Sequence, residues 1–440
     1  MSKQFETYIL NGVTVNDVAK GIINGGEQTG AFFLQDLDDA YQRIEYFKRK
    51  MPRVQIFYAI KSNDNIALLK LVAALGLGFD CATPGELYKV LKLNVNPRSI
   101  IFASPLKHPQ WMTYAKKCGI KYATFDSSFE LKKTKQYWPD ARLLIRIKVD
   151  SNSVYRLSDK FGCDYETEAI DLLDEAARLG IKVVGVAFHV GSVCFSSDSH
   201  VNGLRMARSL FDYEAKNGRR MSIVDIGGGF LSENTTDIDE VSRLVNTALE
   251  EYFPDKSVQI TAEPGRYISD SSMVLYSSIN AVRRVDKNGE KINMLYINDG
   301  IYGTLRCAEV WQTVYKFARN TIENNEEVYK TIIWGNSLDS SDQVLSENKI
   351  YLPQCTTQDW LVFPVRGAYS HVFGSTFACT NLPPIRPVIS KELWKKIKNS
   401  EVFEPEDFIE NPDISAPFPS NIPEVINVQN HLKSNVVLKA

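Results

Sequence analysis

One order of segments recurs along residues 57–267: a short β-rich run, a polar or glycine-containing stretch, and a segment of helical character. The eight runs that open the repeats are FYAIKSN, GLGFDCAT, SIIFASP, YATFDS, RLLIRIKVD, VVGVAFHVGS, SIVDIGGGF and QITAEPGRY. Two of the segments between them, IALLKLVAALG and AIDLLDEAARLG, have apolar residues at helical spacing and stop at glycine, as helices commonly do. This alternation predicts an α/β fold with a (β/α)8 barrel.

The pattern changes after residue 270, where β-rich runs such as SMVLYSSINAVRRV, INMLYINDGIYGT, YKTIIWG and DWLVFPVRGAY follow one another without regular helices. The N-terminal ETYILNGVTVNDV is a candidate extra strand of the same sheet. From Pro383 onward the chain is rich in proline and acidic residues, which predicts a loosely packed tail. We therefore expect a barrel over residues 36–272, an all-β, Greek-key-like domain over residues 1–35 and 273–385, and a partly irregular C-terminal extension over residues 386–440.

Composition restricts the classes of partner. A formal net charge of -2 over 440 residues gives no general attraction to nucleic acid or to an anionic membrane. The start, MSKQFETYILNGVTVNDV, lacks the apolar core of a signal peptide, and no membrane-spanning apolar stretch occurs. The seven cysteines include no C-x-x-C pair, and the five histidines do not show the H-x-x-x-H spacing of metal ligands. We therefore expect reduced thiols and no metal site. These features favour a cytoplasmic protein with a small-molecule or protein partner.

Unusual polar residues fall at or just beyond the ends of the predicted strands. In a (β/α)8 barrel the C-terminal ends of the strands carry the chemistry, because they converge on one rim. The residues placed there are Lys61, Asp80, Arg146, His189, Gly227 to Gly229, Glu263 and Arg266.

The glycines of DIGGGF would let backbone N–H groups approach a phosphate, although the same three residues would also suit a flexible turn. In AEPGRY, Arg266 could pair with that phosphate and Glu263 could reach another part of the ligand, unless the two form a structural ion pair. In HVGS, His189 could stack on an aromatic ring, or could be a satisfied core residue, and Ser192 could donate to the phosphate.

Together with Lys61, these groups meet the requirements of pyridoxal 5'-phosphate (PLP). A lysine amine attaches the cofactor covalently, a carboxylate keeps its pyridine nitrogen protonated, and a glycine-rich cradle anchors its phosphate. A lysine that closes a strand is more often solvated, so the assignment depends on the whole set of residues.

The sequence resembles the fold-type III PLP-dependent decarboxylases, whose barrel is alanine racemase-like. Within them it is similar to the ornithine decarboxylases of polyamine biosynthesis and to their inactive relatives, the antizyme inhibitors. The resemblance rests on motifs that occur in the family's order: FYAIKSND, GFDCAT, RLSDKFG, FHVGS, DIGGGF, AEPGRY, NDGIYG, WG followed by Asp339 and Asp342, and GAYS.

The resemblance implies a role for each matching residue. Lys61 would carry the cofactor, Asp80 and Arg156 would order the groups around it, His189 would stack on its ring, and Glu263 would bind its ring nitrogen. The phosphate ligands would be Ser192, Gly227, Gly228, Gly229, Arg266 and Tyr369. The family also implies a homodimer with shared active sites, in which Asp339 of one subunit serves the site of the other.

The substrate side departs from the family pattern. Ornithine decarboxylases have Tyr-Asp where this chain has Val310 and Trp311, and they have a cysteine, thought to protonate the substrate carbon, where it has Leu338. A buried substrate ammonium without its carboxylate costs several kcal/mol, so a less basic or aromatic amino acid would be preferred. Asp339 remains, however, and Glu309 could supply a carboxylate, so ornithine and lysine stay open as substrates.

The missing cysteine raises a second question. Unless water, His189 or another group supplies the proton, decarboxylation would be slow or coupled to transamination, which yields an aldehyde.

Three functions compete on this sequence. The first is an active decarboxylase with an altered substrate, favoured by the complete set of cofactor residues. The second is an antizyme-inhibitor-like regulator that binds an antizyme-like protein, favoured by Leu338, Trp311 and the basic segments LKHPQWMTYAKKCGIKY and FELKKTKQY, although those segments would also suit solvated helix faces. The third is a PLP-binding barrel without a β-domain, which the β-rich segment after residue 270 disfavours.

Overall fold

A computed structural model describes residues 6–231, 235–287, 289–306, 313–317 and 327–419. Within it, parallel strands close into a barrel in the order β11-β12-β3-β4-β5-β6-β7-β9. These strands are β3 (Val54–Ala59), β4 (Gly78–Cys81), β5 (Ile100–Phe102), β6 (Tyr122–Phe125), β7 (Arg142–Ile147), β9 (Lys182–Phe188), β11 (Ile223–Asp225) and β12 (Gln259–Ala262). Each predicted run contributes one of them, so the predicted (β/α)8 barrel is confirmed.

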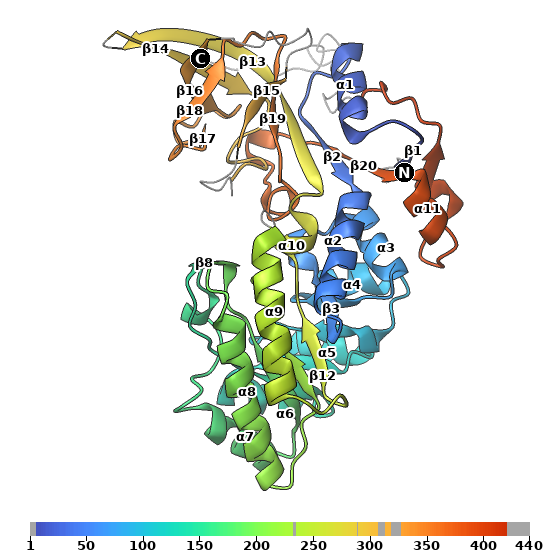
Figure 1. Cartoon of the computed structure of the whole chain (residues 1–440), viewed down its shortest axis with the longest axis vertical. Coiled ribbons are helices and arrows are strands. Elements are labelled where there is room, and N and C mark those ends of the chain that lie inside the picture. Colours follow the sequence, from blue (N-terminus) through green and yellow to red (C-terminus); the bar gives the residue numbers. More distant parts are fainter. Residues whose placement is uncertain (1–5, 232–234, 288, 307–312, 318–326, 420–440) are drawn as a thin grey trace, which may run out of the picture.

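Helices alternate with the barrel strands and surround them (Figure 1). Their starts follow from the sequence, because a capping side chain stands directly before several of them. The side chains of Asn65 and Thr83 accept hydrogen bonds from the N–H groups of Ala67 and Glu86, which fixes where the next helix begins. The helices are α2 (Leu37–Lys50), α3 (Ile66–Ala74), α4 (Pro84–Leu91), α5 (Pro109–Lys117), α6 (Ser128–Tyr137), α7 (Ala169–Arg178), α8 (Ser199–Lys216), α9 (Thr235–Tyr252) and α10 (Arg266–Ser269).

A second sheet lies beyond the barrel along the long axis of the molecule (Figure 1). Its main path runs β17-β16-β14-β13-β2-β20-β1-β21, and β15, β18 and β19 pair beside that path. The strands are β1 (Thr7–Leu10), β2 (Phe32–Asp36), β13 (Met273–Lys287), β14 (Glu290–Ile297), β15 (Tyr315–Phe317), β16 (Val328–Trp334), β17 (Gln343–Val344), β18 (Ile350–Pro353), β19 (Trp360–Phe363), β20 (Ile385–Ser390) and β21 (Phe408–Glu410). The predicted β-rich region after the barrel is confirmed, and β1 joins its sheet as expected. Helix α1 (Val15–Gly25) follows β1, however, so the expectation that residues 1–35 are all-β is wrong.

The expectation of a loosely packed tail from Pro383 is wrong for residues 385–397, which form a strand of the sheet and a helix, whereas no side chain of residues 398–419 is buried. Strand β20 lies between β2 and β1 in the sheet, and helix α11 (Lys391–Ile397) follows it. Arg386 of β20 is 7% exposed, and its guanidinium carbon lies 4.6 Å from the ring centre of Tyr8 and 4.1 Å from that of Phe418. Arg386 Nη1 also donates to the carbonyl of Ala416 at 2.8 Å, which ties the tail to the N-terminal strand. Residues 420–440 lie outside the described part of the chain.

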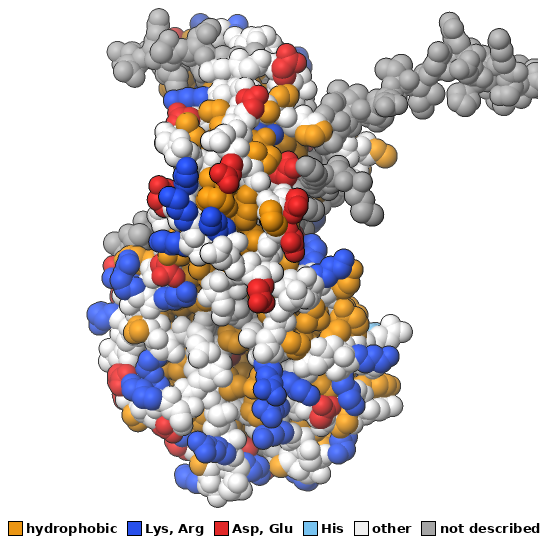
Figure 2. Space-filling model, turned by 90° about the vertical axis from the view of Figure 1, so that its right-hand side faces the viewer, with side chains coloured by type: hydrophobic (Ala, Val, Ile, Leu, Met, Phe, Trp, Pro, Cys, Tyr) orange, Lys and Arg blue, Asp and Glu red, His pale blue; other side chains and the backbone are white. Residues whose placement is uncertain are grey.

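Figure 2 shows acidic and basic side chains over both halves of one face of the molecule, with Lys and Arg side chains prominent over the barrel half. In the described ranges, no helix combines the length and the apolar character needed to cross a bilayer.

Candidate active site

Lys61 and Asp80 form an ion pair at the rim of the barrel. Lys61 lies in a short 3-10 turn, Ile60–Ser62, that directly follows β3. Asp80 lies in β4, where it pairs with Ala59 of β3. The Lys61 ammonium bonds Asp80 Oδ2, while Asp80 is completely buried and its Oδ1 has no hydrogen-bond partner among the described residues. Burial alone would lower the pKa of Lys61, but the charges of Asp80 and Glu263 outweigh it and raise that pKa above its ordinary value.

A cluster of acids stands beside this pair. Glu263 follows β12, and its N–H donates to the carbonyl of Gly227 at 2.7 Å. Burial, together with the charges of Asp225 and Asp80, raises the pKa of Glu263 well above its ordinary value. Burial likewise raises the pKa of Asp225 to about 6, although hydrogen bonds from the Gly227 N–H and from Glu263 oppose the shift. Both shifts favour the protonated form of this carboxyl pair.

Sequence reasoning assigned no role to two members of this cluster. Asp225 is the first residue of DIGGGF, and its place at a strand end was the available signal. Arg146 was placed at the rim without a function. Burial lowers the pKa of Arg146, and the charges of Glu263 and Asp126 oppose that effect. Arg146 therefore offsets part of the negative charge that the barrel concentrates at this end.

The glycine loop, residues 227–229, passes so close to its neighbours that no side chain fits. A Cβ on Gly227 would lie 2.2 Å from the carbonyl oxygen of Phe188, and one on Gly228 would lie 2.9 Å from both His189 Nε2 and the Glu263 carbonyl oxygen. Gly227 and Gly229 have φ of +63° and +101°, which favour glycine. The close approach brings the loop backbone against the ring of His189.

His189 itself follows β9. Its Nδ1 accepts from the N–H of Gly191 at 3.0 Å, which fixes the orientation of the ring. Burial, followed by the positive charges of Arg146 and Lys61, lowers the pKa of His189 well below its ordinary value. The imidazole is therefore neutral at physiological pH.

Three predicted phosphate ligands lie together beside the glycine loop. Arg266 is 8% exposed, its Nε donates to Ser192 Oγ at 3.4 Å, and its guanidinium carbon lies 5.1 Å from the ring centre of Tyr369. The N–H of Tyr369 donates to the carbonyl of Ser62 at 2.9 Å, so this residue of the sheet half lies next to Lys61. Asp270 also accepts from Arg266 Nη1 at 3.3 Å, which holds the guanidinium in place.

The structure does not bring Arg156 into this cluster. Arg156 follows the short strand β8 (Ser153–Tyr155), which pairs with β10 (Ser192–Cys194). Its side chain is 56% exposed, and its Nε lies 3.8 Å from Asp159 Oδ1. The resemblance implied that Arg156 orders the groups around Lys61, but in the structure its side chain is directed to solvent.

The predicted substrate residues lie on the surface of the sheet half. Asp339 is exposed and accepts three hydrogen bonds of 2.8 Å, from Ser341 N–H, Ser341 Oγ and the hydroxyl of Tyr302. These bonds lower its pKa. Leu338 is fully exposed. Val310 and Trp311 lie outside the described residues.

The residues present fit PLP on three grounds. The buried Asp80 Oδ1 has no partner within the described ranges, the glycine loop is a cradle that a Cβ would fill, and the donors of Ser192 and Arg266 converge beside that cradle. A lysine, an acid and an anion cradle on one barrel rim can hold a phosphorylated aldehyde at both of its ends.

Comparisons with known proteins agree with this geometry. Residues 37–270 match the family model described as pyridoxal-dependent decarboxylase, pyridoxal binding domain. The chain is 36% identical to ornithine decarboxylase of Rattus norvegicus over 94% of this chain and 93% of that protein. It is 35% identical to antizyme inhibitor 2 of Xenopus laevis over 89% of this chain and 88% of that protein.

A solved structure shares the whole architecture. The arginine decarboxylase of Paramecium bursaria Chlorella virus, bound to agmatine, superposes with a TM-score of 0.78 at 30% identity, covering 86% of this chain and 100% of that one. Because the match extends over both the barrel and the second sheet, it concerns the full fold and not the barrel alone. The chain therefore belongs to the ornithine decarboxylase family of PLP-dependent carboxy-lyases.

Proposed function

We propose that this protein is a homodimeric amino-acid decarboxylase whose substrate has a less basic side chain than ornithine. The observation that carries the proposal is the ion pair of Lys61 with the buried Asp80 on the barrel rim that also carries the glycine cradle, combined with an altered substrate surface around Leu338. Each half of this proposal has its own support and its own test.

The cofactor half follows from the groups at the barrel rim. When bound, PLP supplies a conjugated ring that accepts the electron pair left by departing carbon dioxide. Lys61 is the amine that would hold the cofactor, and the ion pair with Asp80 Oδ2 orients that amine and favours its charged form. Glu263 would hold the ring nitrogen, as the resemblance implies, and burial raises its pKa, which favours a proton at that contact.

His189 and the phosphate ligands orient the same group. Because its pKa is lowered, the His189 ring is neutral and can stack on the cofactor without adding a positive charge beside Lys61 and Arg146. Ser192 and Arg266 would anchor the phosphate end, which would orient the bound group relative to the Lys61 nitrogen.

The substrate half rests on Asp339 and Leu338. Asp339 has its carboxylate oxygens engaged by Ser341 and Tyr302, which leaves it fewer lone pairs for a distal ammonium group. Leu338 has no acidic proton to offer, and Trp311 replaces the aspartate expected in ornithine enzymes. A bulky apolar surface of this kind favours an uncharged or aromatic side chain.

A dimer would complete the site. Leu338, fully exposed, and Phe377, 47% exposed, are apolar side chains on the face that carries Asp339, and Phe377 packs 4.7 Å from the ring of Tyr302. Coexpression of a Lys61→Ala and an Asp339→Ala variant tests the shared site, because mixed dimers would have one intact site and recover part of the activity. Recovery absent from every mixture would contradict the shared arrangement.

The substrate is tested by incubating the purified protein with PLP and a mixture of the common amino acids plus ornithine, and identifying the products by mass spectrometry. A single amine without a second basic group is expected. Putrescine or cadaverine would contradict the substrate half of the proposal, and an aldehyde would point to misplaced protonation at Leu338.

A second candidate function is a regulator similar to the antizyme inhibitors, which Leu338 and the similarity to antizyme inhibitor 2 favour. The basic segments remain available to a partner, because the side chains of Lys116, Lys117, Lys132 and Lys135 are exposed, although Lys107 is completely buried in an ion pair with Glu130. A visible absorption band from bound PLP, together with any amine product, would exclude it. A protein that binds an antizyme but makes no product would favour it.

A further inference from the structure

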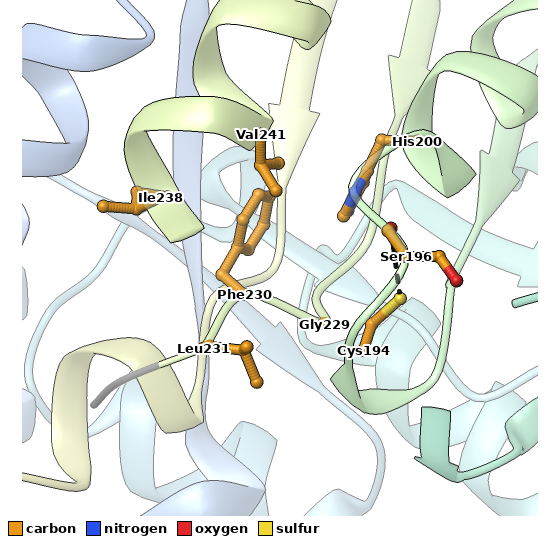
Figure 3. Close-up of a pocket in the computed structure, with 8 residues that line it drawn as sticks. All are labelled: Cys194, Ser196, His200, Gly229, Phe230, Leu231, Ile238 and Val241. Carbon is orange, nitrogen blue, oxygen red and sulfur yellow. Dashed lines mark hydrogen bonds between the residues drawn. The ribbon is translucent and has the colours of Figure 1, made fainter. Parts of the chain in front are cut away.

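His200 is a buried histidine in the first turn of α8, and its side chain contacts the glycine loop (Figure 3). It is 2% exposed, and its ring stacks on that of Phe230 at 4.8 Å with an interplanar angle of 17°. The helix can approach this closely because residue 203 is glycine, where a Cβ would lie 2.4 Å from the ring of Phe188. The packing therefore restricts the imidazole ring of His200 to a single orientation.

The ring makes one polar contact with the loop. His200 Nε2 lies 3.0 Å from the carbonyl oxygen of Gly228. Since a carbonyl oxygen can only accept, Nε2 carries the proton and donates it. Burial lowers the pKa of His200 to about 4, so the ring is neutral at physiological pH and Nδ1 carries the lone pair.

Within the described chain, the pocket beside the His200 ring offers no charged group to the ring nitrogen atoms. His200 borders a pocket with about 20 Å³ of free space, enough for one water molecule, and no charged side chain lines that pocket (Figure 3). Its described lining residues are Cys194, Ser196, Gly229, Phe230, Leu231, Ile238 and Val241. Among the described residues, the hydrogen-bond partner of His200 Nε2 is the Gly228 carbonyl.

The contact determines where the next N–H group points. The carbonyl of Gly228 and the N–H of Gly229 belong to one peptide plane, and in a trans peptide they point in opposite directions. A carbonyl held toward His200 therefore directs the Gly229 N–H away from His200. Neither the Gly228 nor the Gly229 N–H donates to another residue of the described chain.

We propose that His200 is a positioning residue of the anion cradle: by holding the Gly228 carbonyl, it keeps the Gly229 N–H available to the phosphate of the cofactor. Glycine at both positions gives the peptide rotational freedom that no side chain limits, so an external hydrogen bond is needed to fix it. The inference deepens the proposed function and rests on it, because it takes PLP as the ligand of the cradle.

The test compares two cofactors on the apoprotein: PLP, and pyridoxal, which lacks the phosphate. In His200→Phe the stacked ring remains but the hydrogen bond is lost, and we expect PLP to bind about tenfold more weakly while pyridoxal affinity changes by less than about twofold. In His200→Gln an amide donor can still reach Gly228, so PLP affinity should return most of the way to wild type. Phe211 lies in the same helix as His200 and packs on Phe253. Phe211→Leu disturbs that packing, so it should lower thermal stability without changing the ratio of the two affinities.

If His200→Phe weakened the binding of PLP and of pyridoxal equally, the inference would be overturned, because His200 would have only a structural role. Wild-type affinity of His200→Phe for PLP would also overturn it. If His200→Phe does not fold, nitrogen NMR of labelled histidine in the wild-type protein decides: a neutral ring with its proton on Nε2 supports the inference, and a charged ring or a proton on Nδ1 overturns it. Failure of the cofactor half of the proposed function is distinguishable, since wild-type protein would then bind PLP no better than pyridoxal, whereas failure of the substrate half would leave both affinities unchanged.

Discussion

Lys61 and Asp80 are joined by an ion pair in which only one carboxylate oxygen is used: Oδ2 binds the ammonium, and Oδ1 is buried without a hydrogen-bond partner among the described residues. An unsatisfied buried carboxylate oxygen costs free energy, and such costs concentrate at functional sites. The charge of Asp80 therefore acts mainly on Lys61 and on what binds beside it.

Asp80→Asn removes the charge that raises the pKa of Lys61, so that pKa should fall in the apoprotein. NMR of lysine labelled at the side-chain nitrogen would follow the titration of Lys61. Asp64→Asn, which breaks the exposed ion pair of Asp64 with Lys89, is the matched control and should leave the Lys61 titration unchanged. An unchanged pKa in Asp80→Asn would contradict the assignment.

Asp225 predicts a pH dependence of stability. Its pKa is raised by burial from 3.8 to about 6, so the folded protein binds more protons than the unfolded chain between those values. The free energy of unfolding should therefore fall as pH rises from about 4 to 6, by at most about 3 kcal/mol for this group. Asp36 and Asp299, also raised to about 6, contribute with the same sign. Urea unfolding of apoprotein should show a shallower decline in Asp225→Asn, and an identical decline in both proteins would refute this.

Gly228→Ala should damage the cradle, because its Cβ would lie 2.9 Å from both His189 Nε2 and the Glu263 carbonyl oxygen. Overpacking of this kind costs about 1–3 kcal/mol, and the displaced loop should bind PLP at least about tenfold more weakly. Gly85→Ala is the control, since the nearest atom to its Cβ would be 3.8 Å away. Fluorescence titration with PLP measures both variants, and equal affinities would contradict the prediction.

Leu338→Cys should restore an acid at the position where ornithine decarboxylases have one. A positioned general acid contributes about 10²–10⁴-fold, so the ratio of amine to aldehyde product should rise by at least about tenfold. Because Leu338 is fully exposed, the substitution should change stability by no more than about 0.5 kcal/mol. Leu338→Ala controls for side-chain volume. A product ratio shared by all three proteins would show that position 338 does not supply the proton.

Arg386→Lys should destabilise the sheet by about 2 kcal/mol, because lysine cannot keep a planar group between the rings of Tyr8 and Phe418 while bonding the Ala416 carbonyl. Arg283→Lys on the exposed part of β13 is the control and should change stability by less than about 0.5 kcal/mol. Urea unfolding measures both. A loss no larger in Arg386→Lys than in the control would contradict the packing role of the tail.

The barrel could be predicted from the sequence because its signals are local. Each repeat carries its own apolar run and helix-capping residue, and barrel closure then brings strand ends together whatever their separation in the chain. Lys61, Asp80 and Glu263 could be placed on one rim for that reason. The tail was mispredicted because proline and acidic composition carries no information about the strand pairing that buries β20.

The sequence by itself determined the fold class, the order of the rim residues and the groups available to hold PLP, since these depend on periodicity and on residue type. Only the tertiary structure decided that Arg156 points to solvent, that Asp225 and Arg146 join the acid cluster, and that His200 reaches the Gly228 carbonyl. Such contacts join residues from different repeats, and their direction depends on the packing of side chains within a few ångströms, which no local pattern in the sequence encodes.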